Sequence, residues 1–85
     1  MQNIVREMRG IPLWLIREYL EEMGGTATND NLIQAENWKV TLTKMEPFKL
    51  GSLEVGQVLL EIEVEENLAD DFFNQFNRKT LRAGG

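Results

Sequence analysis

Hydrophobic and polar residues alternate along two stretches in the middle of the chain. From Val58 to Val64 every second position is apolar, and glutamates fill most of the positions between. A period of two places alternate side chains on opposite faces of a β-strand. The sequence WKVTLTKM, residues 38–45, has the same period. We therefore predict two strands of an antiparallel sheet that is apolar on one face and solvated on the other.

The two predicted strands can pair with their polar rows side by side, which brings lysine and threonines next to glutamates. The members of these rows are Lys39, Thr41, Thr43, Glu61, Glu63 and Glu65. Opposite charges on neighbouring strands contribute about 0.2–1 kcal/mol per pair. A slip of one residue would bury three glutamates, so we expect a fixed register. The apolar rows are predicted to form the core: Trp38, Val40, Leu42, Val58, Leu60, Ile62 and Val64.

Shorter patterns predict the remaining elements. Apolar residues at helical spacing predict a helix over Pro12–Met23, with Pro12 as its first helical residue and Gly24-Gly25 as a left-handed cap. A second helix is predicted over Asn67–Lys79, with Asn67 as its N-cap. Residues 3–9 are predicted to be an edge strand, and residues 26–35 a short hairpin. The buried stripe of the second helix is predicted to contain Leu68, Phe72, Phe73, Phe76 and Leu81.

The sequence EPFKLGSL between the two long strands predicts a bend. Pro47 cannot donate to a sheet ladder, so we expect it at the end of the first long strand or at a sheet edge. Gly56, inside the second long strand, predicts a bulge. Together the elements predict an α+β fold in the order β-α-β(4)-α, with both helices packed on one face of an antiparallel sheet. Residues 1–85 are expected to form a single domain with a thin core.

Composition and charge restrict the functions that we expect. The chain has 14 acidic and 9 basic residues, a formal charge of −5, and neither cysteine nor histidine. Excess negative charge argues against binding nucleic acid. No apolar run reaches the roughly 20 residues of a membrane span, and MQNIVREMRG lacks the apolar core of a signal peptide, so we expect a cytoplasmic protein. Without histidine or cysteine, we expect no enzyme, no cofactor and no metal.

Four stretches of the chain resemble a known family. They are IPLWLIREYLEEMGG, ENWKVTLT, FKLGSLEVGQVLLEIE and KTLRAGG. These are similar to the C-terminal domain of proteins related to the small sulfur-carrier subunit of molybdopterin synthase, over nearly the whole chain. The resemblance implies a TATA-binding-protein-like fold and no defined reaction. Because the carrier half precedes this domain in fuller members of that family, the resemblance does not by itself transfer a sulfur-carrying role.

An accessory or protein-interaction domain is the leading hypothesis, linked to molybdopterin or sulfur-carrier pathways. Its partner would be another protein or a second copy of the chain, since charge asymmetry steers protein association. Exposed tryptophan is enriched at interfaces, although it also packs in cores. The candidate interaction face contains Glu61, Glu63, Glu65, Lys39, Thr41 and Trp14.

Two alternative functions remain open. The first is a sulfur carrier or modifier activated at Gly84-Gly85, because glycines permit a close approach of backbone in a narrow activating site. Glycines after a helix are also an ordinary stop signal. The second alternative is a small-ligand module, although aromatic residues in so short a chain also serve simply as core. Its pocket would be lined by Trp14, Tyr19, Phe48, Phe72 and Phe76.

Overall fold

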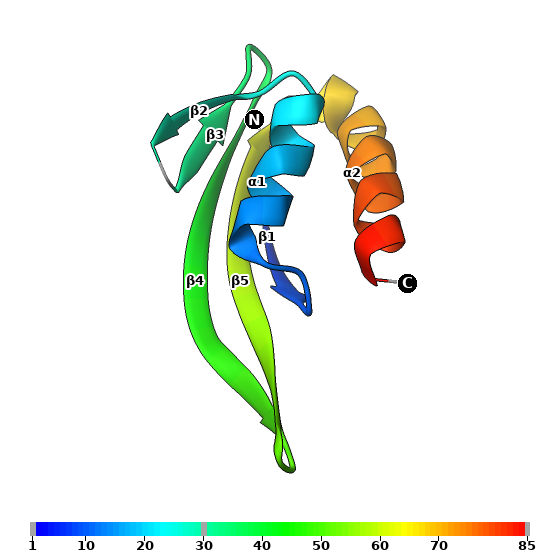
Figure 1. The fold of residues 1–85 in the computed structure, drawn as a ribbon. Coiled ribbons are helices and arrows are strands. Elements are labelled where there is room, and N and C mark those ends of the chain that lie inside the picture. The colour runs from blue at the N-terminus through cyan, green and yellow to red at the C-terminus, as the bar shows by residue number, and fades with distance from the viewer. Residues whose placement is uncertain (1, 30, 85) are drawn as a thin grey trace.

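A computed structural model describes the backbone of residues 2–29 and 31–84, and the side chains of these residues up to Leu81. Within these residues the element order is β1-α1-β2-β3-β4-β5-η1-α2, where η1 is a 3-10 turn. The strands are β1 (Gln2–Arg9), β2 (Thr26–Asn29), β3 (Leu32–Gln34), β4 (Trp38–Leu50) and β5 (Leu53–Val64). The helical elements are α1 (Leu13–Glu22), η1 (Glu66–Leu68) and α2 (Ala69–Gly84). Figure 1 shows both helices on the same side of the sheet.

The strands form one antiparallel sheet of five strands in the order β1-β5-β4-β3-β2. Its register pairs Lys39 with Glu63 and Thr41 with Glu61, as the polar rows predict. The two rows match only in part, because the same register places Thr43 opposite Leu59. Glu65 follows β5, which ends at Val64 where the chain turns into η1. The predicted edge strand and short hairpin are confirmed as β1 and the β2–β3 pair.

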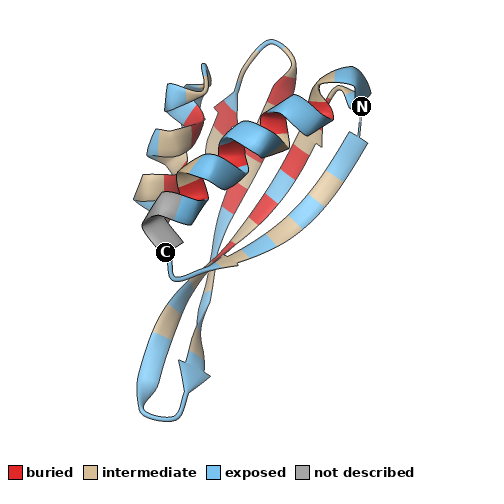
Figure 2. Cartoon of the chain, turned by 90° about the vertical axis from the view of Figure 1, so that its right-hand side faces the viewer, coloured by how far each residue is buried: buried red, intermediate tan, exposed pale blue. Residues whose placement is uncertain are grey.

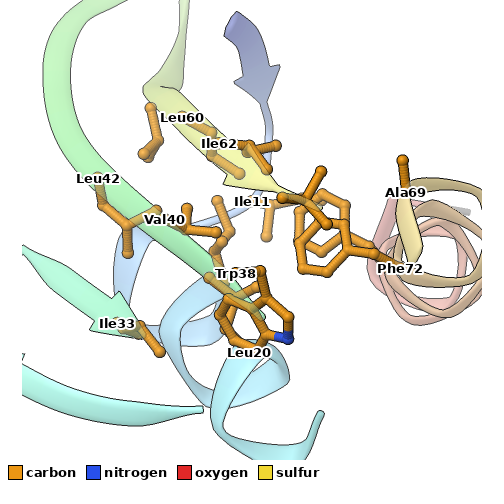
Figure 3. Close-up of a cluster of buried hydrophobic side chains, with 14 residues drawn as sticks. Ile11, Leu20, Ile33, Trp38, Val40, Leu42, Leu60, Ile62, Ala69 and Phe72 are labelled. Atoms are coloured by element: carbon orange, nitrogen blue, oxygen red, sulfur yellow. The ribbon is translucent and has the colours of Figure 1, made fainter. Parts of the chain in front are cut away.

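The core lies between the sheet and the helices. All seven positions predicted from the apolar rows of β4 and β5 are buried, and α1 adds Ile16 and Leu20. From α2, Phe72 and Phe76 join the cluster, and the rings of Trp38 and Phe72 have their centres 5.2 Å apart (Figure 3). The buried positions of the strands lie beneath the helices in Figure 2. The predicted α+β class, with an antiparallel sheet and two helices, is confirmed.

The ends of α1 differ in part from the prediction. Pro12 is the N-cap and not the first helical residue, because its backbone is extended at φ −69° and ψ 152°. Its carbonyl oxygen nevertheless accepts hydrogen bonds from the backbone N–H groups of Leu15 and Ile16. At the other end, Gly24 has φ +101°, which confirms the predicted left-handed cap.

The predicted start of α2 agrees with the structure, whereas its predicted end and one predicted buried position are wrong. The helix begins at Ala69, close to the predicted start near Asn67, and residues 66–68 precede it as a 3-10 turn. Leu81, predicted to be buried, is 71% exposed. Thr80 is buried in its place, four residues after Phe76, and its hydroxyl donates to the Phe76 carbonyl oxygen at 3.0 Å. The helix also continues to Gly84, beyond its predicted end.

Of the two positions expected for Pro47, the strand end is wrong and the edge is confirmed, because β3 pairs with β4 only as far as Thr41. β4 continues to Leu50, through a register irregularity between Met45 and Phe48 that contains Pro47. A proline is tolerated at such a bulge because no ladder hydrogen bond is required of it there. The extra residue therefore lies on β4, opposite the predicted bulge position Gly56. Residues 46–56 form a projecting two-stranded ribbon and not a bend (Figure 1), and we call this ribbon the arm.

Candidate functional site

The sheet face opposite the helices, which we call the open face, carries the candidate site. The period of two that buries Val40 and Ile62 turns their neighbours Lys39, Thr41 and Glu61 away from the core. A shallow hollow of about 310 Å³ crosses β1, β5 and β4 on this face. Its lining residues are Asn3, Ile4, Val5, Lys39, Thr41, Glu61, Ile62 and Glu63.

A second hollow extends the first toward the other edge of the sheet. Its volume is about 480 Å³, and it shares Lys39 and Thr41 with the first hollow. The remaining lining residues come from the β2–β3 hairpin: Asn29, Asn31 and Leu32. The open face is therefore a mixed surface of amides, charged groups and single apolar side chains.

The charges on the open face are only partly paired. Lys39 Nζ lies 3.3 Å from Glu63 Oε2, and these side chains are 44% and 42% exposed. An ion pair at this exposure contributes about 0–1 kcal/mol. Glu61 lies between Val5 and Thr41 in the register, so neither of its cross-strand neighbours is cationic. Val5 is 67% exposed, which places an apolar contact point directly beside that carboxylate.

The structure brings together four of the six residues predicted for the interaction face. Lys39, Thr41, Glu61 and Glu63 line the same hollow, whereas Glu65 lies beyond the end of β5. Trp14 is 59% exposed on α1, on the helical side of the molecule, and does not join them.

The predicted carrier tail is only partly within the described residues. Gly84 is the last residue of α2, and Gly85 lies outside the described residues. Activation of the chain at this tail therefore stays a prediction.

The five aromatic residues considered for a ligand pocket do not come together. Trp14 is exposed, Phe48 lies in the arm, and Phe72 and Phe76 belong to the core. A hollow of about 290 Å³ does lie between the end of α1 and the start of α2, where Phe72 and Trp38 contribute to a lining of mixed polar and apolar residues. The other lining residues are Met23, Gly24, Ala35, Glu36, Asn37, Leu68, Asp71 and Gln75.

Sequence reasoning missed the contribution of β1 and the β2–β3 hairpin to the open face. With a period of two, Val5 lies on the opposite face of β1 from the apolar residues Ile4 and Met8. This position of Val5 is the sequence signal that indicates a contribution of β1 to the open face. Among the described residues, no group of three or more histidine, cysteine or acidic side chains is placed to hold a metal ion. Neither helix in the described part of the chain has the length and apolarity that a membrane crossing requires.

These features define a small α+β protein with an antiparallel sheet of five strands and two helices. A family model described as archaeal MoaD-like protein matches residues 4–85. The chain therefore belongs to the archaeal MoaD-like protein family, which confirms the resemblance seen in its sequence and relates it to small sulfur carriers. No curated protein matches the chain.

Proposed function

We propose that the chain is a non-catalytic accessory domain that binds a protein partner through its open face, in a pathway that uses a sulfur carrier, such as molybdopterin synthesis. The observation that carries this proposal is the uncovered sheet face with Val5, 67% exposed, beside Glu61. An isolated exposed apolar residue needs no explanation. Here, however, it borders a hollow that spans three strands and contains a carboxylate without a cationic cross-strand neighbour.

The open face favours a partner with a basic side chain next to an apolar one. Glu61 would accept the basic group, and Val5 would contact the apolar group. Lys39 and Glu63 already neutralise each other at 3.3 Å, so they would contribute more to the orientation of the bound partner than to the binding affinity. A formal charge of −5 on the whole chain would also accelerate its encounter with a basic surface.

The residue types present support a binding role more than a reaction. The chain has no histidine and no cysteine, the side chains most used for acid–base and nucleophilic steps at neutral pH. Carboxylates could act instead, but Glu63 is engaged by Lys39 and Glu61 lies in a shallow, solvated hollow. We therefore assign the open face to recognition.

Site-specific photocrosslinking can test the proposal. A benzophenone amino acid at Thr41 should capture a partner among the purified sulfur-carrier and activating proteins of the same source, whereas one at Glu18 on α1 should not. Glu61→Lys should weaken the purified complex about tenfold, equivalent to about 1.4 kcal/mol. Glu18→Lys makes the same charge change on the exposed surface of α1 and should have little effect. Equal effects of the two variants would refute the assignment to the open face.

A second candidate function is supported by the family match: a carrier activated at Gly84-Gly85. It requires Gly85 to carry the terminal carboxylate, which an activating enzyme would adenylate and a sulfur donor would convert to a thiocarboxylate. Because Gly84 is helical, the last turn of α2 would have to open, and this is inexpensive for a glycine. Incubation with an activating enzyme, ATP and a sulfur donor, followed by mass spectrometry, tests this role. Absence of both adducts would reject it, whereas an adduct lost on deletion of Gly84-Gly85 would support it.

A further inference from the structure

The arm extends beyond the strands that flank it. β1 pairs with β5 only as far as Gln57, and β3 pairs with β4 only as far as Thr41. Residues 46–56 therefore form a ribbon of two strands whose edges have no strand partner among the described residues, apart from one hydrogen bond at the base, which the Gly10 backbone N–H donates to the Gly56 carbonyl oxygen. The ribbon lengthens the molecule to 43 Å against 25 and 21 Å in the other directions (Figure 1). Gly51, at φ +64°, begins the two-residue turn at its tip.

One face of the arm is entirely apolar. Its members come from two cross-strand pairs, Phe48–Val55 and Leu50–Leu53, which are two residues apart and so share a face. The intervening pair, Lys49–Glu54, lies on the other face. We call the first four residues the apolar quartet. Leu50 is 62% exposed and Leu53 is 65% exposed, so the outer half of the quartet is open to solvent.

The base of the arm is fixed to the rest of the sheet. Arg9, at the end of β1, places its guanidinium 4.1 Å from the centre of the Phe48 ring. Its Nε donates to Gln57 Oε1 at 3.0 Å, and Gln57 Nε2 donates to the Glu46 carbonyl oxygen at 3.0 Å. These contacts hold the strand irregularity in place, so the apolar quartet is presented in one orientation.

An apolar surface on a two-stranded ribbon is more stable when it packs against another surface. Two-stranded hairpins are at best marginally stable in water unless their apolar face packs against something. The unpaired edges and exposed leucines are also the features that invite association with another chain. We propose that the apolar quartet binds the same surface on a second copy of this chain.

The charge of the arm permits a second copy and argues against two other occupants. The arm contains Glu46, Lys49 and Glu54, and Arg9 stacked on it brings the net formal charge of this region to zero. The formal charge of −5 therefore resides on the rest of the molecule, where two copies repel each other. A projecting neutral arm allows association while keeping the acidic bodies apart. An anionic membrane would instead select a basic arm, and a charged protein partner would select an arm of the opposite charge.

The expected dimer is weak. A stable interface buries about 800 Å² on each partner, whereas four side chains form a much smaller patch. We expect a dissociation constant between about 1 µM and 1 mM. The apolar quartet shares no residue with the hollows of the open face, so failure of this inference and failure of the proposed function can be told apart.

Sedimentation of the whole chain up to about 1 mM tests the proposal. The native chain should dimerise with concentration, and the Leu50→Ser/Leu53→Ser variant should weaken dimerisation at least about tenfold while its circular dichroism stays unchanged. Trp14→Ser/Leu81→Ser removes two other exposed apolar side chains and should dimerise like the native chain. Because the chain has no cysteine, Ser52→Cys can carry a single spin label at the turn. A discrete distance between two such labels should appear with the dimer.

Three results would overturn the inference. The first is a monomer throughout the concentration range. The second is a dimer that the Leu50→Ser/Leu53→Ser variant retains, or that the Trp14→Ser/Leu81→Ser variant loses equally. The third is binding to vesicles of phosphatidylcholine and phosphatidylserine that depends on Leu50 and Leu53 while the protein alone stays monomeric, since this would assign the quartet to a lipid surface.

Discussion

Gly25 lies between α1 and the sheet, where the absence of a side chain makes room for the core. A Cβ at this position would lie 2.5 Å from Trp38 Cη2, 2.7 Å from Ile33 Cγ2 and 3.0 Å from the Leu20 carbonyl oxygen. All three neighbouring residues are buried, so none can yield by moving into solvent. Interiors are close-packed, and even one added methyl group displaces its neighbours. Gly25→Ala should therefore destabilise the folded chain by overpacking.

Overpacking of this kind costs about 1–3 kcal/mol. At about 4–8 °C per kcal/mol for a domain of this size, the melting temperature of Gly25→Ala should fall by at least about 4 °C. Gly56→Ala is the matched control, since no atom lies within 4 Å of its added Cβ. That change should be neutral, or should stabilise by about 0.4–1 kcal/mol through the reduced entropy of the unfolded chain.

Thermal and urea denaturation, followed by circular dichroism, measure both variants. A double-mutant cycle with Trp38→Phe identifies the contact, because phenylalanine lacks the atom that the new Cβ meets. Trp38→Phe should lower the free energy of unfolding in both backgrounds, and the decrease should be at least about 0.5 kcal/mol smaller in the Gly25→Ala chain than in the native chain. The packing argument is refuted if Gly25→Ala and Gly56→Ala have the same stability.

Three further predictions address the core, the open face and metal dependence. Ile62→Ala should lower the free energy of unfolding by about 2–5 kcal/mol in urea denaturation, whereas exposed Leu81→Ala should change it by less than about 0.5 kcal/mol. The Lys39–Glu63 coupling energy from a double-mutant cycle should not exceed about 1 kcal/mol and should fall in high salt; a larger, salt-insensitive value would contradict it. A chelator should leave the melting temperature unchanged, and a decrease would show that a bound metal contributes to stability.

Alternation along the chain was sufficient to predict the core and much of the open face. Burying Val40 and Ile62 requires that Lys39, Thr41 and Glu61 face the other way, and one register satisfies both strands. Such predictions succeed because they depend on a periodic set of side chains and not on any single one. The prediction that Glu65 belongs to the polar row is wrong for the same reason. The alternation in the sequence continues beyond Val64, but the strand ends at that residue.

The arm could not be predicted from local chemistry. Pro47 is a signal for a strand end, but the strand continues beyond the irregularity through three cross-strand pairs, Phe48–Val55, Lys49–Glu54 and Leu50–Leu53. In α2, Leu81 is the more apolar residue, but Thr80 has the right spacing from Phe76 and satisfies its hydroxyl within the helix. In both cases the position of the residue in the fold outweighs the preference of the residue itself.

The two surfaces argued to bind partners are connected through β1, an edge strand that is anchored on both of its faces. On the covered face, the Arg6 guanidinium lies 5.0 Å from the centre of the Phe73 ring and donates to Asn77 Oδ1 at 2.8 Å, which ties β1 to α2. Three residues later, Arg9 packs on Phe48 and ties β1 to the arm. Surfaces that are fixed before binding lose little conformational entropy when a partner arrives. The same arginines place charge along an exposed strand edge, which discourages unspecific addition of further strands. β1 therefore supports recognition at both surfaces while opposing aggregation at its own edge.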